Sequence, residues 1–151
     1  MPAPVVETAR LRLRPWQKAD FRPYHAILQH PDVHRHFGPE PMGQEECWRR
    51  LLASVGCWQV NGFGTWAVTR KSDEKLIGNA GLFTAWRGLD PEFGEDPEMG
   101  WIFAQEVHAL EPDFAERRVK RQLRKILLAS ADVARRVEGI VFIVENQDAV
   151  L

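Results

Sequence analysis

The segment from Pro97 to Glu116, PEMGWIFAQEVHALEPDFAE, constrains the fold more than any other part of the chain. Strand side chains alternate between two faces, and here both faces carry apolar residues, so we predict a buried strand from Glu98 to Ala104. A proline then ends the run, and the capping-box pattern D-x-x-E predicts a long helix that begins at about Phe114. The unpaired N–H groups at such a helix start point into the gap after the strand. This junction is therefore a common place to hold an anionic cofactor.

Composition and charge restrict the class of protein. The 151 residues are 44% hydrophobic and 27% charged, with a net charge of -1, which is typical of a folded protein and argues against bulk electrostatic binding to nucleic acid. No apolar run approaches the roughly 20 residues of a membrane span, and the N-terminus lacks the basic-then-apolar order of a signal peptide. We therefore expect one domain over residues 1–151, in the cytoplasm and without a membrane partner. Cys47 and Cys57 should be reduced, structural residues.

The first part of the chain shows strand and helix patterns in turn. Arg10–Pro15 alternates apolar and basic residues, which predicts a strand with one buried face. Lys18–Gln29 suits an amphipathic helix that stops at His30-Pro31, because the residue before a proline avoids helical angles. Gln44–Val55 suits a second helix that closes near Gly56.

Two β-rich runs follow and predict an antiparallel hairpin. They are Thr65–Thr69 and Leu76–Phe83, separated by polar residues. Gly78 and Gly81 lie inside the second run, where a glycine usually marks a bulge or a close approach of another backbone or ligand. The Gly-, Pro- and acid-rich stretch Trp86–Asp96 should be a loop that could border a pocket.

The last part of the chain predicts a helix and one more strand. Apolar residues at spacings of three and four predict that the helix from Phe114 extends to about Val137. The short apolar run Gly139–Glu145 is typical of a strand covered on both faces. It would lie parallel to the strand at Glu98–Ala104 if the helix is a crossover.

Four local sequences resemble the GNAT superfamily, and within it the RimJ/RimL-type N-acetyltransferases. They are ETARLRLRP at Glu7–Pro15, PDVHRHFG at Pro31–Gly38, GTWAVTRKSDEKLIGNAGL at Gly64–Leu82 and PEMGWIF at Pro97–Phe103. The resemblance implies an α/β (α+β) fold, in which a GNAT-like mixed, mostly antiparallel sheet is flanked by helices. It also implies that the sheet splays between its fourth and fifth strands and that this chain's version is incomplete at the C-terminus.

The same resemblance implies an activity and a set of contacts. Acetyl would pass from acetyl-CoA, a cosubstrate held in the gap between the splayed strands, to a primary amine such as a protein N-terminus or a small amine. The main chain near Ile102, Phe103 and Ala104 would pair with the pantetheine arm, and one amide there would face the thioester oxygen. Glu98 is the best-placed carboxylate for a general base, directly or through water. A carboxylate at a solvent-exposed strand edge is the alternative interpretation of Glu98.

The chain departs from the family pattern where the pyrophosphate should be held. The implied contacts are His108, Ala109 and Leu110, but no glycine occurs between Gly100 and Gly139, and acidic residues follow. Glycine normally gives a phosphate cradle its free backbone angles and open amides. The family's tyrosine general acid also has no counterpart, because Tyr24 is the single tyrosine. The alternative is a non-catalytic GNAT-like protein that acts through self-association or partner binding.

Other clusters predict less. His30, His34 and His36 are close in sequence, but a metal site needs a converging further ligand, so we expect surface or structural roles and no metal. The basic run Arg117–Lys125 is one helix face, which is too narrow to predict a nucleic-acid partner. The apolar strand Ile140–Val144 has little sequence after it to cover it, so we predict a homodimer in which a second chain covers this region.

Overall fold

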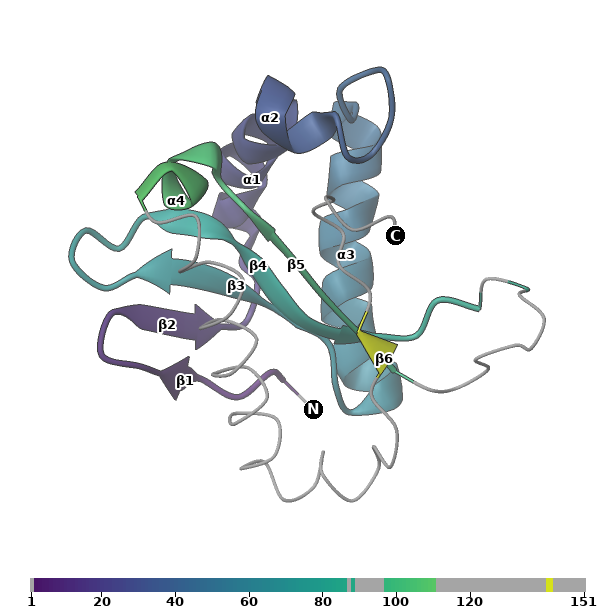
Figure 1. Cartoon of the computed structure of the whole chain (residues 1–151). Coiled ribbons are helices and arrows are strands. Elements are labelled where there is room, and N and C mark those ends of the chain that lie inside the picture. Colours follow the sequence, from purple (N-terminus) through teal and green to yellow (C-terminus); the bar gives the residue numbers. More distant parts are fainter. Residues whose placement is uncertain (1, 87, 89–96, 111–140, 143–151) are drawn as a thin grey trace.

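The protein is described by a computed structural model that covers residues 2–86, 88, 97–110 and 141–142 (Figure 1). Its strands are β1 (Val6–Glu7), β2 (Leu11–Arg14), β3 (Thr65–Arg70), β4 (Leu76–Phe83), β5 (Glu98–Phe103) and β6 (Val141–Phe142). Its helices are η1 (Lys18–Asp20), α1 (Phe21–Gln29), α2 (Pro31–His34), α3 (Gln44–Asn61) and α4 (Gln105–Leu110).

The strands described form one sheet in the order β1-β2-β3-β4-β5-β6. Strands β1 to β5 pair antiparallel, and β6 pairs parallel with β5. The predicted mixed, mostly antiparallel sheet flanked by helices is confirmed. The predicted helix from Phe114 to Val137, most of the predicted loop Trp86–Asp96 and the ends of the run Gly139–Glu145 lie outside the described residues.

The N-terminal hairpin of β1 and β2 contains one strand that the sequence did not predict. Val6 pairs with Leu13, and Glu7 pairs with Arg12. The Thr8 hydroxyl in the intervening turn accepts a hydrogen bond from the Leu11 amide at 3.0 Å, which closes the turn. The Thr8 amide also donates to the Leu11 carbonyl at 2.9 Å. The apolar alternation begins only at Arg10, so it did not indicate the two-residue strand before this turn.

The helices partly correct the sequence interpretation. Helix α1, with η1 before it, confirms the predicted helix, and His30 ends it with extended backbone angles. The short helix α2 was not predicted; Pro31 begins it, and the His30 ring accepts a hydrogen bond from the Asp32 amide. Helix α3 runs to Asn61, so its predicted end near Gly56 is wrong. Gly62 ends it instead, in a left-handed conformation (φ 73°) that glycine adopts without strain.

The predicted hairpin of β3 and β4 is confirmed, and its glycines lie where another backbone comes close. A Cβ on Gly78 would be 2.0 Å from the Ile102 carbonyl oxygen of β5. A Cβ on Gly81 would be 2.3 Å from the Gly64 carbonyl oxygen before β3. The register between β3 and β4 shifts at Val68 and Thr69, so β4 carries an extra residue beside Gly78.

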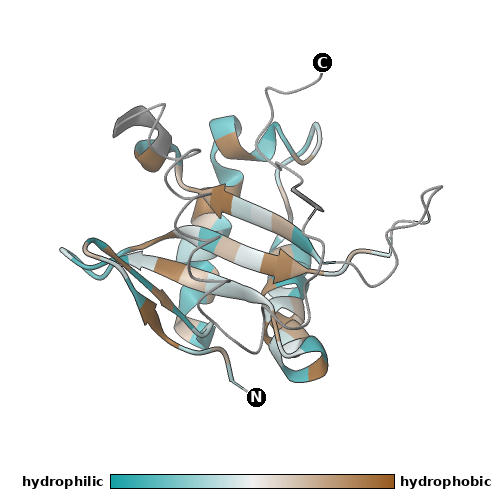
Figure 2. Ribbon diagram, turned by 60° about the horizontal axis from the view of Figure 1, so that its bottom comes forward, coloured by the Kyte–Doolittle hydropathy of each residue, from teal (hydrophilic) through white to brown (hydrophobic). Residues whose placement is uncertain are grey.

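Two apolar clusters cover the two faces of the sheet. On one face, α1 and α3 pack Tyr24, Leu28 and Leu51 over a cluster that also holds Ala67 of β3 and Ile102 of β5. The other face carries a cluster that includes these strand residues: Leu13, Trp66, Val68, Ala80, Leu82, Met99, Trp101 and Phe103. In Figure 2 the turns at the sheet's edge are mostly hydrophilic, whereas brown apolar positions recur along the strands. Every residue of β5 is buried, as its two apolar faces predicted.

No helix in the part of the chain that the structure describes is both long enough and apolar enough to cross a membrane.

The contact at Gly78 gives a first test of this fold. Replacing Gly78 with Ala should lower the free energy of unfolding by about 3 kcal/mol or more, because the new Cβ meets a backbone carbonyl and φ is +150°. Urea unfolding followed by tryptophan fluorescence measures the change. Gly43→Ala is the control, since nothing lies within 4 Å of its Cβ position, and it should stay within about 1 kcal/mol. Equal effects of the two changes would contradict the close packing of β4 on β5.

Candidate functional site

The main-chain groups of β5 point alternately toward β4 and away from it. The Ala104 N–H donates to the Ile77 carbonyl at 2.9 Å, one step beyond the register pair Gly78↔Phe103. In an antiparallel ladder every second pair of opposite residues exchanges hydrogen bonds, so Ile102, Gly100 and Glu98 also direct their N–H and C=O toward β4. Phe103 directs both groups to the other side. This is the β6 side of β5, where Met99 pairs with Phe142.

This alternation of main-chain directions reduces the number of residues on β5 that are free to hold a cofactor through their main chain. Of the residues predicted to pair with a pantetheine arm, Ala104 has its amide already bonded to β4, and Ile102 lies in a hydrogen-bonded pair with Asn79 of β4. Phe103 alone of the three presents its amide and carbonyl on the β6 side. An extended, amide-bearing ligand could continue the ladder there as a strand does.

Glu98 lies at the start of β5 and is 2% exposed, so the alternative of a solvent-exposed edge carboxylate is wrong. It pairs with Phe83 of β4 and with Val141 of β6, which places its Cα between two strands. Its side chain is on the same face as Ile102, which is the face covered by α1 and α3. Burial of a carboxylate costs free energy unless the group is paired or hydrogen-bonded. A buried carboxylate therefore has a function more often than a carboxylate on the surface does.

The predicted loop after β5 begins as a helix. His108, Ala109 and Leu110 belong to α4, which starts at Gln105 directly after the strand, with the Val107 amide donating to the Ala104 carbonyl at 2.9 Å. The expectation of a turn up to about Phe114 is therefore wrong for these three residues. Gln, Glu, Ala and Leu favour helix, and no Gly or Pro interrupts the run before Pro112. Cofactor contact by these residues stays a prediction, and 111–113 lie outside the described residues.

Ion pairs connect α4 to the turn between β3 and β4. The Lys75 ammonium donates to Glu106 Oε2 at 2.9 Å, and a guanidinium nitrogen of Arg70 is 3.9 Å from Glu106 Oε1. Arg70 also holds Asp73, whose pKa its guanidinium lowers to about 2 by a hydrogen bond to the carboxylate. Each solvent-exposed pair of this kind contributes little to the free energy of folding. Together they connect the first turn of α4 to the β3–β4 hairpin, whose β4 strand pairs with β5.

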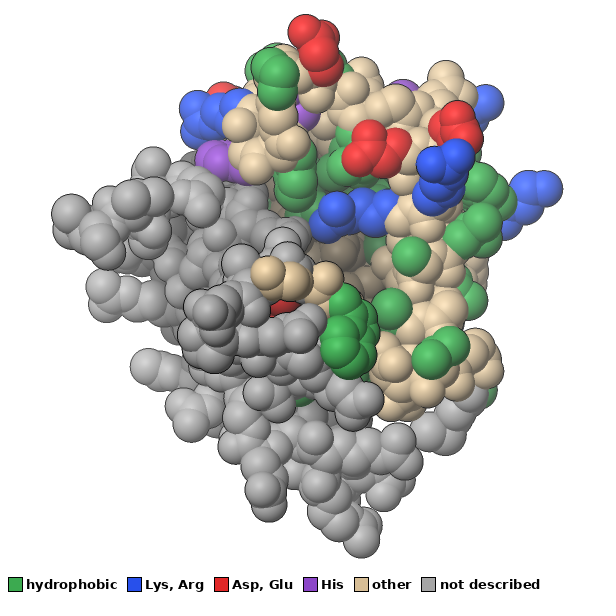
Figure 3. Space-filling model, turned by 90° about the vertical axis from the view of Figure 1, so that its right-hand side faces the viewer, with side chains coloured by type: hydrophobic (Ala, Val, Ile, Leu, Met, Phe, Trp, Pro, Cys, Tyr) green, Lys and Arg blue, Asp and Glu red, His purple; other side chains and the backbone are tan. Residues whose placement is uncertain are grey.

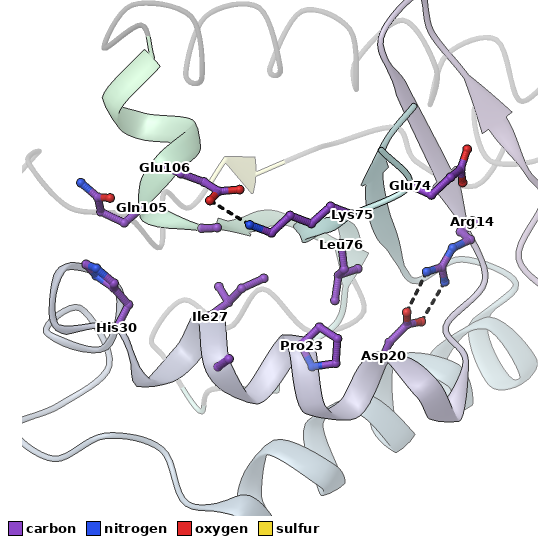
Figure 4. Close-up of a pocket in the computed structure, with 12 residues that line it drawn as sticks. Arg14, Asp20, Pro23, Ile27, His30, Glu74, Lys75, Leu76, Gln105 and Glu106 are labelled. Carbon is purple, nitrogen blue, oxygen red and sulfur yellow. Dashed lines mark hydrogen bonds and ion pairs between the residues drawn. The ribbon is translucent and has the colours of Figure 1, made fainter. Parts of the chain in front are cut away.

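A cavity of about 650 Å³ lies between α1 and this ion-paired end of the sheet (Figure 4). Pro23, Ile27 and Leu76 contribute apolar surface to it, and Lys75 and Glu106 reach over it from the opposite side. At one end, Arg14 donates two hydrogen bonds to the Asp20 carboxylate, at 2.7 and 2.8 Å. Arg14 is thus paired with Asp20, and Lys75 is paired with Glu106. The cavity therefore has apolar walls and a charged rim whose cations are balanced by carboxylates. That balance does not suit a polyanionic ligand.

A polar contact crosses the core beneath α1. The Tyr24 hydroxyl, on a side chain 1% exposed, donates to Asn79 Oδ1 at 3.3 Å. Asn79 is 5% exposed and lies opposite Ile102, so the contact reaches the helix-covered face of β5. We did not identify Asn79 from the sequence. The sequence does hold one indication of its importance. Asn79 is a polar residue in the middle of the apolar run LIGNAGLF, and an amide side chain needs a hydrogen-bond partner when it is buried.

The histidines and cysteines form no further site in the described ranges, where no three metal-ligating side chains converge. Both cysteines are free, as predicted, and burial raises the pKa of the Cys47 thiol to about 11. A thiol with so high a pKa is protonated at neutral pH and is a poor nucleophile. Cys57 lies within α3, not after it as the predicted helix end implied.

Comparison with known proteins agrees with this architecture. A family model described as the acetyltransferase (GNAT) domain matches residues 10–137. A solved structure from Bordetella pertussis, assigned to the GNAT-family acetyltransferases, is similar with 26% identity and a TM-score of 0.72, over 93% of this chain and 78% of that one. A GNAT-family acetyltransferase of Bacillus anthracis has 16% identity and a TM-score of 0.62, over 92% and 72%. The ribosomal-protein-S5-alanine acetyltransferase of Vibrio fischeri has 16% identity and a TM-score of 0.61, over 93% and 73%.

The direction of the main-chain groups on β5 predicts a hydrogen-exchange pattern. Without ligand, the Ala104 amide should exchange slowly, because it is bonded to Ile77. Addition of acetyl-CoA, the cosubstrate that the resemblance implies, should slow exchange at the Phe103 amide and leave that at Ala104 unchanged. Residue-resolved exchange by NMR measures both amides in one sample. Protection gained at Ala104 instead of Phe103 would show that the ladder is assigned to the wrong side.

Proposed function

This chain belongs to the GNAT acetyltransferase family, and we propose that it transfers an acetyl group from acetyl-CoA to a primary amine. The observation that carries the proposal is the geometry of β5. One strand directs the Phe103 main chain away from β4 and buries the Glu98 carboxylate at its other end. Acetyl transfer needs little more from a protein than placement of a thioester beside an amine, a donor for its carbonyl and a base.

The residues of β5 fit an acetyl-CoA ligand at its amide-bearing arm. Phe103 would hold that arm through its N–H and C=O, on the β6 side of the strand. When bound, acetyl-CoA supplies the thioester whose acetyl group is transferred. Glu98 would take a proton from the ammonium of the acceptor, directly or through a water, so that the neutral nitrogen becomes the nucleophile. As the C–N bond forms, the C–S bond of the thioester would break, and the CoA thiolate would leave and take up a proton from solvent. The strand itself orients these two parts, because it is buried along its whole length.

For the acceptor we propose a protein N-terminus or a small amine. The support is the RimJ/RimL-type resemblance of the local sequences, together with the description of the Vibrio fischeri relative as acting on alanine of ribosomal protein S5. The 650 Å³ cavity beside α1 is not the proposed acceptor site, because it opens at the Ala104 end of β5. Glu98 is six residues away along the strand, which is about 20 Å at ~3.3 Å per residue.

A second candidate function rests on a specific observation. No glycine occurs between Gly100 and Gly139, and His108–Leu110 are helical, so the usual glycine-rich phosphate cradle is absent at these residues. A GNAT-fold protein without acetyl-CoA binding would act through self-association or a partner. The two candidates differ in whether the cosubstrate binds at all.

Titration calorimetry separates these candidates. If the protein is an acetyltransferase, acetyl-CoA should bind with a dissociation constant in the micromolar range, near typical KM values for enzymes. Free adenosine diphosphate is the control, and it should bind at least tenfold more weakly because it lacks the arm that pairs with Phe103. An absence of heat at millimolar acetyl-CoA would reject the enzyme and leave the non-catalytic candidate.

Replacement of Glu98 with Gln tests its role as base. The change keeps the shape of the buried side chain but removes its proton affinity, so kcat should fall by about 10²–10⁴-fold at pH 7. The dissociation constant for acetyl-CoA should stay within about twofold, since the arm is held by main chain. Peptides with an N-terminal alanine or serine and a polyamine serve as acceptors, with thiol release as the assay. Unchanged kcat in a stably folded Glu98→Gln protein would exclude the proposed role.

A further inference from the structure

The second half of α3 has an outward face without charge. Glu45, Glu46, Arg49 and Arg50 are all in its first half, and no charged residue occurs from Leu51 to Gly62. Leu52 and Val55 are nevertheless 49% and 40% exposed, and Val60 is 84% exposed. Figure 3 shows the same division, with charged side chains toward the top and a green and tan surface at the lower right. A helix face on the solvent side of a lone molecule normally carries charge.

Gly56 lies in the middle of this face, and no contact among the described residues explains a glycine there. Glycine in a helix interior is destabilising relative to alanine. A Cβ at Gly56 would meet nothing within 4 Å, so no contact in the described part of the chain requires its absence. Small residues in a helix allow the backbone of a second helix to approach closely. A glycine at position 56 therefore suits close packing against a second helix.

The spacing around Gly56 identifies that partner. Leu52 is four residues before it and Val60 is four residues after it, so both lie on its face of the helix. An antiparallel pair of α3 helices crossing at Gly56, related by a twofold axis, would place Leu52 of each copy against Val60 of the other. An interface between identical copies must be self-complementary in this way. We propose that the protein is a homodimer through α3, with Gly56 at the crossing point.

Trp86 is a further exposed apolar side chain, close in sequence to a contact with the end of α3. It is 61% exposed and lies two residues after Thr84, whose hydroxyl accepts a hydrogen bond from the Asn61 side chain at the end of α3. A stable interface buries about 800 Å² on each partner, which is more than Leu52, Val55 and Val60 can supply. An exposed tryptophan close in sequence to this contact at the end of α3 adds area of the kind that interface cores favour. The sequence suggested Ile140–Val144 as the dimer contact, whereas this proposal places the contact on α3.

Substitutions of exposed residues test the interface without disturbing the core. Val60→Lys places a charge in the proposed contact and is compatible with the C-terminal end of a helix, where a cation is favourable. Ser72→Lys is the control, since it adds the same charge in the exposed turn between β3 and β4. Sedimentation velocity from 1 to 100 µM should show a dimer for the unaltered protein and for Ser72→Lys. Val60→Lys should be monomeric, with its dissociation constant raised at least tenfold.

Gly56→Ala gives a second, independent test, because it should stabilise the isolated chain and weaken the dimer. The methyl group should stabilise each isolated chain, raising the melting temperature of the Val60→Lys monomer by about 2–4 °C. In the unaltered background it should weaken the dimer at least tenfold by separating the two helices. A monomeric unaltered protein at 100 µM would overturn the proposal. So would a dimer that survives Val60→Lys and Gly56→Ala, because its contact would then lie on another surface.

Discussion

The antiparallel ladder between β4 and β5 is the interaction on which the rest of this structure depends. It runs from Gly78↔Phe103 to Phe83↔Glu98 and continues through the Ala104 amide to Ile77. Because hydrogen-bonded pairs alternate with open ones, this single register decides which main-chain groups of β5 are used within the sheet and which face the β6 side. It also decides that Glu98 is on the helix-covered face with Ile102. The ladder is close only because Gly78 has no Cβ to meet the Ile102 carbonyl.

Sequence patterns predicted those elements whose signal comes from their own side chains. Alternation in Arg10–Pro15 predicted one strand, and the β-rich composition of Thr65–Thr69 and Leu76–Phe83 predicted two more. The end of α3 was misplaced, since a glycine at position 56 looks the same in the sequence as a helix end. Only the backbone shows that Gly62, with positive φ, ends the helix and that Gly56 continues it. Strand β1 was missed because it is only two residues long and lies before the apolar alternation that begins at Arg10.

The sequence predicted the strand that carries the candidate site, but it did not predict which way the main-chain groups of that strand point. Alternation placed Glu98 and Ile102 on one face, and that is correct. It could not separate Phe103 from Ile102 and Ala104, because main-chain direction depends on which pairs of β4 and β5 are hydrogen-bonded. Glu98 lies between its register partners Phe83 of β4 and Val141 of β6, which come from other parts of the chain. Asn79 accepts a hydrogen bond from Tyr24, which is 55 residues away in the sequence, so its role could not be seen from its own neighbours in the chain.

A site formed by main-chain groups places unusual demands on a sequence. A buried apolar residue at position 103 can change to another of similar size without altering its N–H or C=O, so the fold and the proposed arm contact can persist while identity falls. Gly78 and Gly81 are different, because any Cβ would meet a backbone carbonyl, and Glu98 is different because its chemistry lies in the side chain. Register is the stricter requirement. A slip of one residue between β4 and β5 would exchange the faces of the strand. The same slip would turn the Phe103 groups toward β4 and move Glu98 to the opposite face, so the site would be lost with every residue still present.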